Sequence, residues 1–171
     1  MKLHQKYFIP FMGIGAIITM IFIVYASFNF KTKQEENFRT NITEYTTLLT
    51  DAHPSIYSSD SLRLSAFDGK KVIVLFWASW SELSADIMNE LDLLADDKSF
   101  AVIAAVVKDA TETVELVIPN HNFIYVDGTK LFNHLKVPGI PSYFVLDEQG
   151  LFKQSFVGYH KKATQNVISL F

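Results

Sequence analysis

The chain has 171 residues, of which 49% are hydrophobic and 19% are charged, and its formal net charge is −3. This composition argues against a largely disordered chain. A net negative protein is poorly suited to nucleic-acid backbones, so we expect no nucleic-acid partner. The chain contains no cysteine, which excludes disulfides, thiolate metal sites and cysteine nucleophiles within it.

An uncharged and mostly apolar run extends from Tyr7 to Phe30, after a short tail of residues 1–6. As a helix these residues would span about 36 Å, enough to cross a hydrocarbon core of ~30 Å. We therefore predict a membrane anchor over residues 7–30. The alternative is a cleavable signal peptide, because Val24-Tyr25-Ala26 resembles a cleavage site, although secretory apolar regions are usually shorter, at about 7–15 residues. Basic residues flank both ends, so charge does not settle the orientation.

Residues 31–54 are predicted to form a juxtamembrane stalk. Apolar residues recur in it at Phe38, Ile42, Tyr45, Leu48 and Leu49. This spacing suits either an amphipathic helix or a solvated spacer, and we favour the spacer. The segment also contains the glycosylation-type motif Asn41-Ile42-Thr43, which is too short to carry weight by itself.

From residue 55 onwards, strand patterns and helix patterns alternate. Continuous apolar runs predict buried strands at 72–76, 101–107 and 123–126. Helices are predicted around 83–94 and at 111–117, 129–135 and 161–170. Residues 143–146 and 151–157 are predicted to pair as a hairpin around a glycine-containing turn. This order favours an α/β sandwich with parallel strands followed by an antiparallel hairpin.

Three motifs occur in a fixed order along this region. They are Phe76-Trp77-Ala78-Ser79-Trp80, then Val137-Pro138-Gly139-Ile140-Pro141-Ser142, then Asp147-Glu148-Gln149-Gly150 with Gly158-Tyr159. Together they resemble the thioredoxin superfamily, most closely its membrane-anchored, extracytoplasmic TlpA-like and ResA-like thiol–disulfide oxidoreductases. The resemblance covers about residues 55–171. It implies a thioredoxin-like three-layer α/β sandwich after one transmembrane helix, a cis-proline at Pro141, and a single-pass protein with this domain outside the cytoplasm.

The active site that the resemblance implies is incomplete. The two cysteines of the family's Cys-x-x-Cys motif fall on Ser81 and Ser84. A serine hydroxyl does not ionise near pH 7 and two serines cannot form a disulfide, so we predict no catalytic residue of the family's kind. Two further departures are Leu75, where classical thioredoxins have a buried acid, and Asn89, where the family often has a helix proline.

Ser81 has two possible roles. A nucleophilic serine needs a positioned base, yet the histidines lie far from it in the sequence, and we favour a helix cap instead. The histidines also lack metal-ligand spacing, so we expect neither a metal nor a cofactor. We expect Trp77 to pack in the core and Trp80 to be exposed.

A peptide-binding groove is the part of the family's site that this chain retains. The resemblance implies a groove formed by Trp80, Ser81, Leu83, Ser84, Ile140 and Pro141. In active relatives an extended peptide docks beside the cis-proline, much as an added strand does. We therefore predict a redox-inactive, membrane-anchored module that binds an extracytoplasmic polypeptide. The alternative is a TlpA-like thiol–disulfide oxidoreductase, acting in redox homeostasis or cytochrome maturation, in a cysteine-to-serine form. We find no acid/base pair to support a non-redox enzyme.

Overall fold

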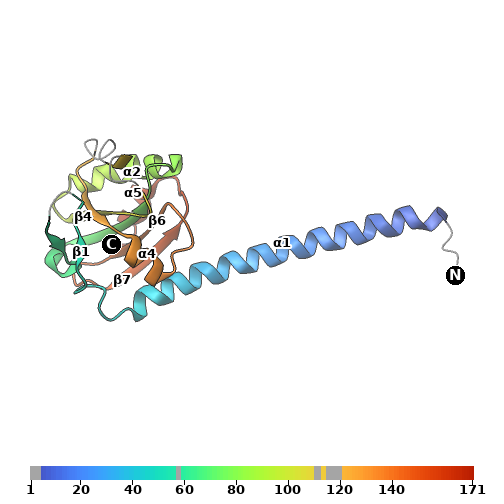
Figure 1. Ribbon diagram of the computed structural model, residues 1–171, viewed down its shortest axis with the longest axis horizontal. Coiled ribbons are helices and arrows are strands. Elements are labelled where there is room, and N and C mark those ends of the chain that lie inside the picture. The colour runs from blue at the N-terminus through green and yellow to red at the C-terminus, as the bar shows by residue number, and fades with distance from the viewer. Residues whose placement is uncertain (1–4, 57–58, 110–112, 115–120) are drawn as a thin grey trace. The chain divides into compact units, whose positions relative to one another are not determined.

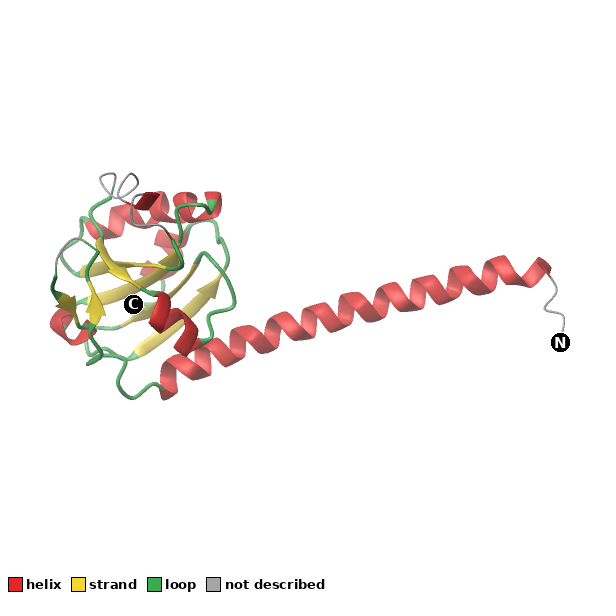
Figure 2. Ribbon diagram, in the orientation of Figure 1, coloured by secondary structure: helices red, strands yellow, loops and turns green. Residues whose placement is uncertain are grey.

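The computed structural model describes residues 5–56, 59–109, 113, 114 and 121–171. The chain divides into two compact units, Met1–Glu36 and Asn37–Phe171. The elements in chain order are α1 (Gln5–Glu44), β1 (His53–Pro54), β2 (Ser61–Leu62), a 3₁₀ turn (Leu64–Phe67), β3 (Lys71–Trp77), α2 (Glu82–Ala95), β4 (Phe100–Val106), β5 (Ile124–Asp127), α4 (Thr129–Leu135), β6 (Ser142–Leu146), β7 (Phe152–Val157) and α5 (Ala163–Ile168) (Figures 1 and 2).

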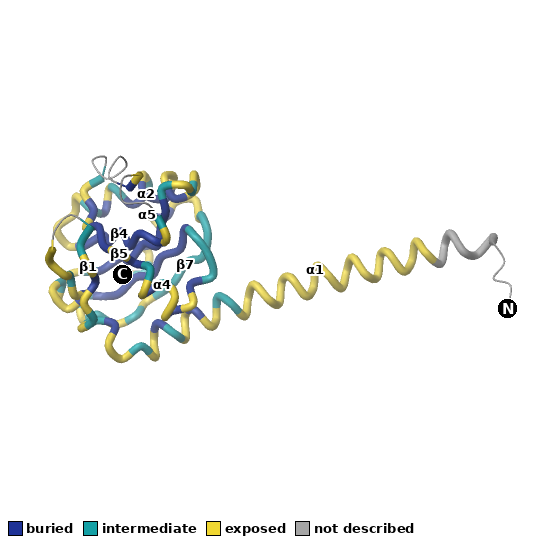
Figure 3. The backbone as a smooth tube through the Cα atoms, in the orientation of Figure 1, coloured by how far each residue is buried: buried dark blue, intermediate teal, exposed yellow. Residues whose placement is uncertain are grey.

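The first unit contains most of helix α1. Every side chain from Met12 to Lys33 is exposed (Figure 3), and most of those before Lys31 are apolar. By length and composition this helix is able to cross a membrane, with a mean hydropathy of 1.9 over its apolar window. An exposed apolar surface of this kind is stable only in contact with lipid or another apolar surface. The predicted anchor over residues 7–30 therefore overlaps the candidate membrane span Met12–Glu44.

The second unit is built on one mixed sheet of five strands in the order β5-β4-β3-β6-β7. Strands β3, β4 and β5 are parallel, whereas β6 runs antiparallel to β3 and pairs with β7 as a hairpin. A separate two-stranded sheet joins β1 and β2. Parallel strands followed by a hairpin were expected from the sequence and are confirmed. The helix expected at 111–117 falls mainly outside the described residues.

Helices cover both faces of the sheet because its central strand is apolar on both sides. The odd-numbered residues of β3, from Ile73 to Trp77, share a buried cluster with residues of α2 and α5. The even-numbered residues, from Val72 to Phe76, share a second cluster with residues of α4 and of the last turns of α1. This two-residue alternation follows from the pleat of a strand. The three-layer sandwich is thereby confirmed.

The predicted solvated spacer is wrong from Asn37 onwards, because this part of the chain belongs to the second unit. Phe38 is 0% exposed and Ile42 is 2% exposed. The Phe38 ring meets the Phe76 ring edge-on, with centroids 6.4 Å apart. Residues four apart lie on one face of a helix, so the apolar face of an amphipathic helix is buried here. The amphipathic alternative fits the structure.

Replacing Phe38 by alanine should destabilise the second unit by about 3–5 kcal/mol, because the change leaves a cavity in a buried aromatic cluster. The measurement is denaturant unfolding of the full chain in detergent, followed by tryptophan fluorescence, which changes as the buried Trp77 becomes exposed. Thr40→Ala on the exposed face of the same helix is the control, with an expected change within about 0.5 kcal/mol. Equal stability of the two variants would contradict the burial of this helix end.

Candidate functional site

Strand register brings the first two sequence motifs to one edge of the sheet. In the antiparallel pair of β3 and β6, Phe76 lies opposite Ser142. Trp77 is the last residue of β3, and Pro141 directly precedes β6. The loop that follows β3 and the loop that precedes β6 therefore start side by side. The structure thus brings together the two loops that carry the predicted groove residues.

A carboxylate after β4 fixes the loop after β3. The backbone N–H of Ser79 donates to Asp109 Oδ2, and the Ser79 hydroxyl donates to Asp109 Oδ1 at 3.0 Å. Two hydrogen bonds to one charged group constrain the loop more strongly than two neutral bonds would. Sequence reasoning missed Asp109. The available signal was the parallel pairing of β3 and β4, which places residues after Val106 beside those after Trp77.

The two serines that replace the family's cysteines have different surroundings. Ser81 is the N-cap residue of α2, as expected from the sequence, but its side chain makes no capping hydrogen bond. Ser84 lies one turn further on, and its N–H donates to the Ser81 carbonyl at 2.9 Å. Ser84 is 1% exposed, and its hydroxyl oxygen accepts a long bond of 3.5 Å from the N–H of Ala78. Ser81 is therefore half-buried and partly accessible at the start of α2, whereas Ser84 is buried.

The two tryptophans at the end of β3 and in the loop after it differ in exposure. Trp77 is 1% exposed and meets the Tyr125 ring edge-on, with centroids 5.9 Å apart. Trp80 is 65% exposed, and Leu83 in the first turn of α2 is 48% exposed. A buried Trp77 and an exposed Trp80 match the expectation from the sequence. Exposed large apolar side chains beside a polar rim are typical of an interaction surface.

The loop before β6 contains a cis peptide bond between Ile140 and Pro141, as the resemblance implies. The carbonyl of the buried Pro141 accepts the N–H of Gly158 at 2.8 Å, and the hydroxyl of Ser142 donates to the Gly139 carbonyl at 2.7 Å. Ile140 is half-buried, and within the described part of the chain its own N–H and carbonyl form no backbone hydrogen bond. Its main-chain polar groups therefore take no part in the hydrogen bonding of the sheet among the described residues.

Not every predicted groove residue lines the surface. Trp80 and Leu83 are exposed, and Ser81 and Ile140 are half-buried, whereas Ser84 and Pro141 are buried. A side chain with almost no exposed area cannot touch a bound molecule directly. Ser84 and Pro141 therefore pack beneath the surface of the predicted groove and do not line it.

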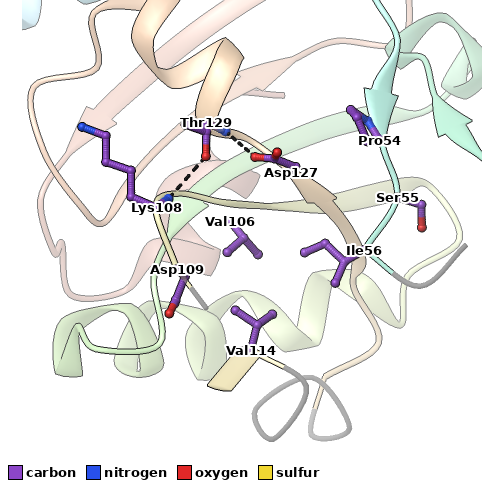
Figure 4. Close-up of a pocket in the computed structure, with 9 residues that line it drawn as sticks. All are labelled: Pro54, Ser55, Ile56, Val106, Lys108, Asp109, Val114, Asp127 and Thr129. Carbon is purple, nitrogen blue, oxygen red and sulfur yellow. Dashed lines mark hydrogen bonds between the residues drawn. The ribbon is translucent and has the colours of Figure 1, made fainter. Parts of the chain in front are cut away.

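A hollow of about 330 Å³ adjoins this site at the carboxyl ends of β4 and β5 (Figure 4). Its walls include Ile56, Val106 and Val114, whose side chains point toward one another in the close-up. The rim includes Asp109, the residue that holds the Ser79 loop. Asp109 therefore both lines the hollow and holds the loop after β3.

Histidine contacts in the described residues do not support a nucleophilic Ser81. His134 stacks on Tyr45, His160 bonds to the Val157 carbonyl, and His121 lies 3.3 Å from a carboxylate oxygen of Asp92. A serine nucleophile needs a base within hydrogen-bond reach. No group of three or more His, Asp or Glu side chains able to hold a metal ion occurs in the described part of the chain.

His53 is buried, and its Nε2 has no hydrogen-bond partner in the described structure. Burial lowers the pKa of His53, the nearby charge of Lys130 lowers it further, and the charge of Asp51 raises it in part. A buried imidazole is disfavoured in its charged form, so its folded-state pKa lies below the unfolded value of about 6.5. The unfolded state therefore binds more protons in the window between these two pKa values.

Stability should fall as the pH is lowered from about 6.5 toward the folded-state pKa of His53, and this site should contribute no pH dependence above that window. We expect His53→Gln to reduce the slope of unfolding free energy against pH over this range. Denaturant titrations of the full chain at several pH values measure the slope. His160→Gln, at an exposed position, is the matched control. An unchanged slope in the His53 variant would show that another group titrates.

The family model described as Redoxin matches residues 51–168. Among solved structures, a secreted disulfide oxidoreductase of Mycobacterium tuberculosis shares 10% identity at a TM-score of 0.63, covering 74% of this chain and 99% of its own. A thioredoxin family thiol:disulfide interchange protein of Chlorobium tepidum shares 16% identity at 0.60, covering 70% and 91%. The exposed lipoprotein thioredoxin of Streptococcus pneumoniae shares 20% identity at 0.57, covering 70% and 98%. At these identities the likeness shows the fold alone. No curated protein sequence matches the chain.

Proposed function

This chain belongs to the Redoxin family, and we propose that it is a redox-inactive member that binds an extended polypeptide without reacting with it. The site for the polypeptide is the surface formed by Trp80, Leu83, Ser81 and Ile140. The observation that carries the proposal is that Ile140, beside Pro141, makes no backbone hydrogen bond among the described residues, in a protein that has no cysteine.

Main-chain pairing would supply the affinity. The N–H and carbonyl of Ile140 form no backbone hydrogen bond among the described residues, so they can offer the two bonds that an added strand uses, and such pairing needs no sulfur. Trp80 is exposed in the loop that follows β3, which starts beside the loop of Ile140, and its ring offers apolar contact area. Aromatic side chains of this size often contribute most of the binding energy of an interface. The chemistry of the site therefore suits a polypeptide in extended form.

The loss of redox activity follows from the residues at the start of α2. The family's thiolate is stabilised at a helix N-terminus, where the helix dipole favours negative charge. Ser81 occupies that position here, and the second serine is buried one turn later. Neither side chain can accept or release electrons as a thiol pair does.

Membrane attachment and location outside the cytoplasm complete the proposal. The candidate membrane span Met12–Glu44, which contains most of the apolar run 7–30, supports attachment by a single pass. Two of the similar structures come from proteins described as secreted and as an exposed lipoprotein. A polypeptide outside the cytoplasm is therefore the partner we propose.

The double change Trp80→Ala and Leu83→Ala should weaken polypeptide binding at least about tenfold, because it removes exposed apolar area at the centre of the proposed surface. The probe is a fluorescently labelled, S-carboxymethylated insulin B chain, which has no thiol and no fixed tertiary structure. Its anisotropy is titrated with the full chain in detergent. Leu93→Ala, an exposed apolar residue further along α2, is the matched control. Absent binding by the unchanged protein, or equal weakening by the control, would contradict the proposal.

The second candidate function is the family's thiol–disulfide exchange in a cysteine-to-serine form. It is favoured by the positions of Ser81 at the N-cap and Ser84 one helical turn later, joined by a backbone hydrogen bond. Residues three apart on a helix have Cβ atoms about 5–6 Å apart, so a small adjustment brings two cysteines to bonding distance.

Restoring both cysteines, as Ser81→Cys with Ser84→Cys, should give a chain that forms an internal disulfide and reduces insulin in the presence of dithiothreitol. The single change Ser84→Cys should show neither property, because the nucleophilic position at the helix N-terminus is still serine. Thiol titration and insulin turbidity are the measurements. An inactive double variant would show that more than sulfur separates this site from an active one.

A further inference from the structure

The last turns of α1 present one face to helix α4 and the sheet. Phe38, Asn41, Ile42 and Tyr45 follow the spacing i, i+3, i+4 and i+7, which aligns them along a single helical face. Phe38 and Ile42 share a buried cluster with Leu135 of α4. The Tyr45 ring, just past the end of the helix, stacks on His134 with centroids 4.1 Å apart. This face is therefore in contact with the final turn of α4.

Asn41 supplies a hydrogen bond that α4 cannot make for itself. The last carbonyls of any helix lack partners within that helix. In α4 the carbonyls of Phe132 and Asn133 accept the N–H groups of Val137 and Lys136, at 3.1 Å and 3.3 Å. The carbonyl of Leu135, the last residue of α4, accepts Asn41 Nδ2 at 2.9 Å. A side chain 94 residues earlier in the sequence thus completes the end of this helix.

The end of α4 is also the start of the loop that carries Pro141. Lys136 has φ 50° and ψ 47°, a left-handed conformation that favours glycine over lysine. Such a backbone conformation persists only where the contacts of the neighbouring residues stabilise it. Val137 is buried in the cluster that contains Phe38 and Ile42. The far end of the loop is tied by the bond from Gly158 to Pro141.

We infer that Asn41 is a positioning residue for the cis-proline loop. Its amide holds the Leu135 carbonyl and so sets where residues 136–141 leave α4 and where Ile140 presents its main chain. That this loop receives a polypeptide rests on the proposed function. Asn41 lies outside the region 51–168 that the Redoxin model matches, so this support comes from a segment before the family's own domain.

Asn41→Asp tests the inference, because aspartate has the same shape but lacks the N–H that donates. The variant is made in the full chain in detergent, and amide hydrogen exchange is compared at Val137 and Gly158, whose N–H groups hold the two ends of the loop. We expect protection at both to fall about tenfold, because an unsatisfied carbonyl replaces a hydrogen bond. Protection at Ile103 and Ala104, which are buried in β4 between β3 and β5, should be unchanged. Thr43→Ala, whose hydroxyl donates to the carbonyls of Arg39 and Thr40 in the same helix, should leave every amide unchanged.

Two outcomes would overturn the inference. An equal fall at the loop and in β4 would assign Asn41 to general stability, and unchanged exchange at Val137 and Gly158 would show that the loop does not depend on it.

If Asn41→Asp does not fold, Asn41→Ala is measured in the same way. Weaker binding of the labelled polypeptide by Asn41→Asp, with normal binding by Thr43→Ala, is the expected second readout. Should the unchanged protein not bind the polypeptide, the proposed function fails, while the exchange experiment still decides whether Asn41 positions the loop.

Discussion

The antiparallel pairing of β3 with β6 is the constraint on which the site depends. It runs from Val72 opposite Leu146 to Phe76 opposite Ser142, and it places the end of one strand beside the beginning of the other. A slip of one residue would turn the side chains of β3 to the opposite faces. Because those side chains are buried on both faces, such a slip would disturb two apolar clusters at once. The same burial that stabilises the sheet therefore keeps Pro141 next to the loop of Trp80.

Much of this arrangement was predictable because it leaves a local signature. A strand buried on both faces is a continuous apolar run, which identified β3 and β4 to within a residue at each end. The helix predicted at 129–135 coincides with α4, since its apolar residues recur at helical spacing between a threonine and a turn. The cis-proline was implied by motif order rather than by any pattern in composition. These features depend on neighbours in the sequence, or on a resemblance that spans them.

Other features could not be predicted because they depend on contacts in the folded structure that the local sequence does not determine. The spacing of Phe38 and Ile42 reveals an apolar face but not the surface that packs against it, so the sequence does not distinguish a solvated spacer from a packed helix. The bond between Ser79 and Asp109 joins residues 30 apart and exists only because β3 and β4 are parallel and in register. The hydroxyl of Ser81 was expected to cap α2, yet that bond depends on the side-chain rotamer, which the residue type does not determine.

The position of Phe38 and Ile42 has a consequence for any cut that would separate the domain from the membrane. The region recognised by sequence similarity begins at residue 51, whereas the apolar core of the second unit already includes Phe38. Proteolysis between Ile42 and residue 51 would remove Phe38 and Ile42, which pack in one cluster with Phe76 and Leu135. The remaining fragment would expose an apolar surface that is prone to self-association. Release of an intact, soluble domain therefore requires cleavage before Asn37. The folded unit begins at Asn37, whereas the region that matches the family begins at residue 51.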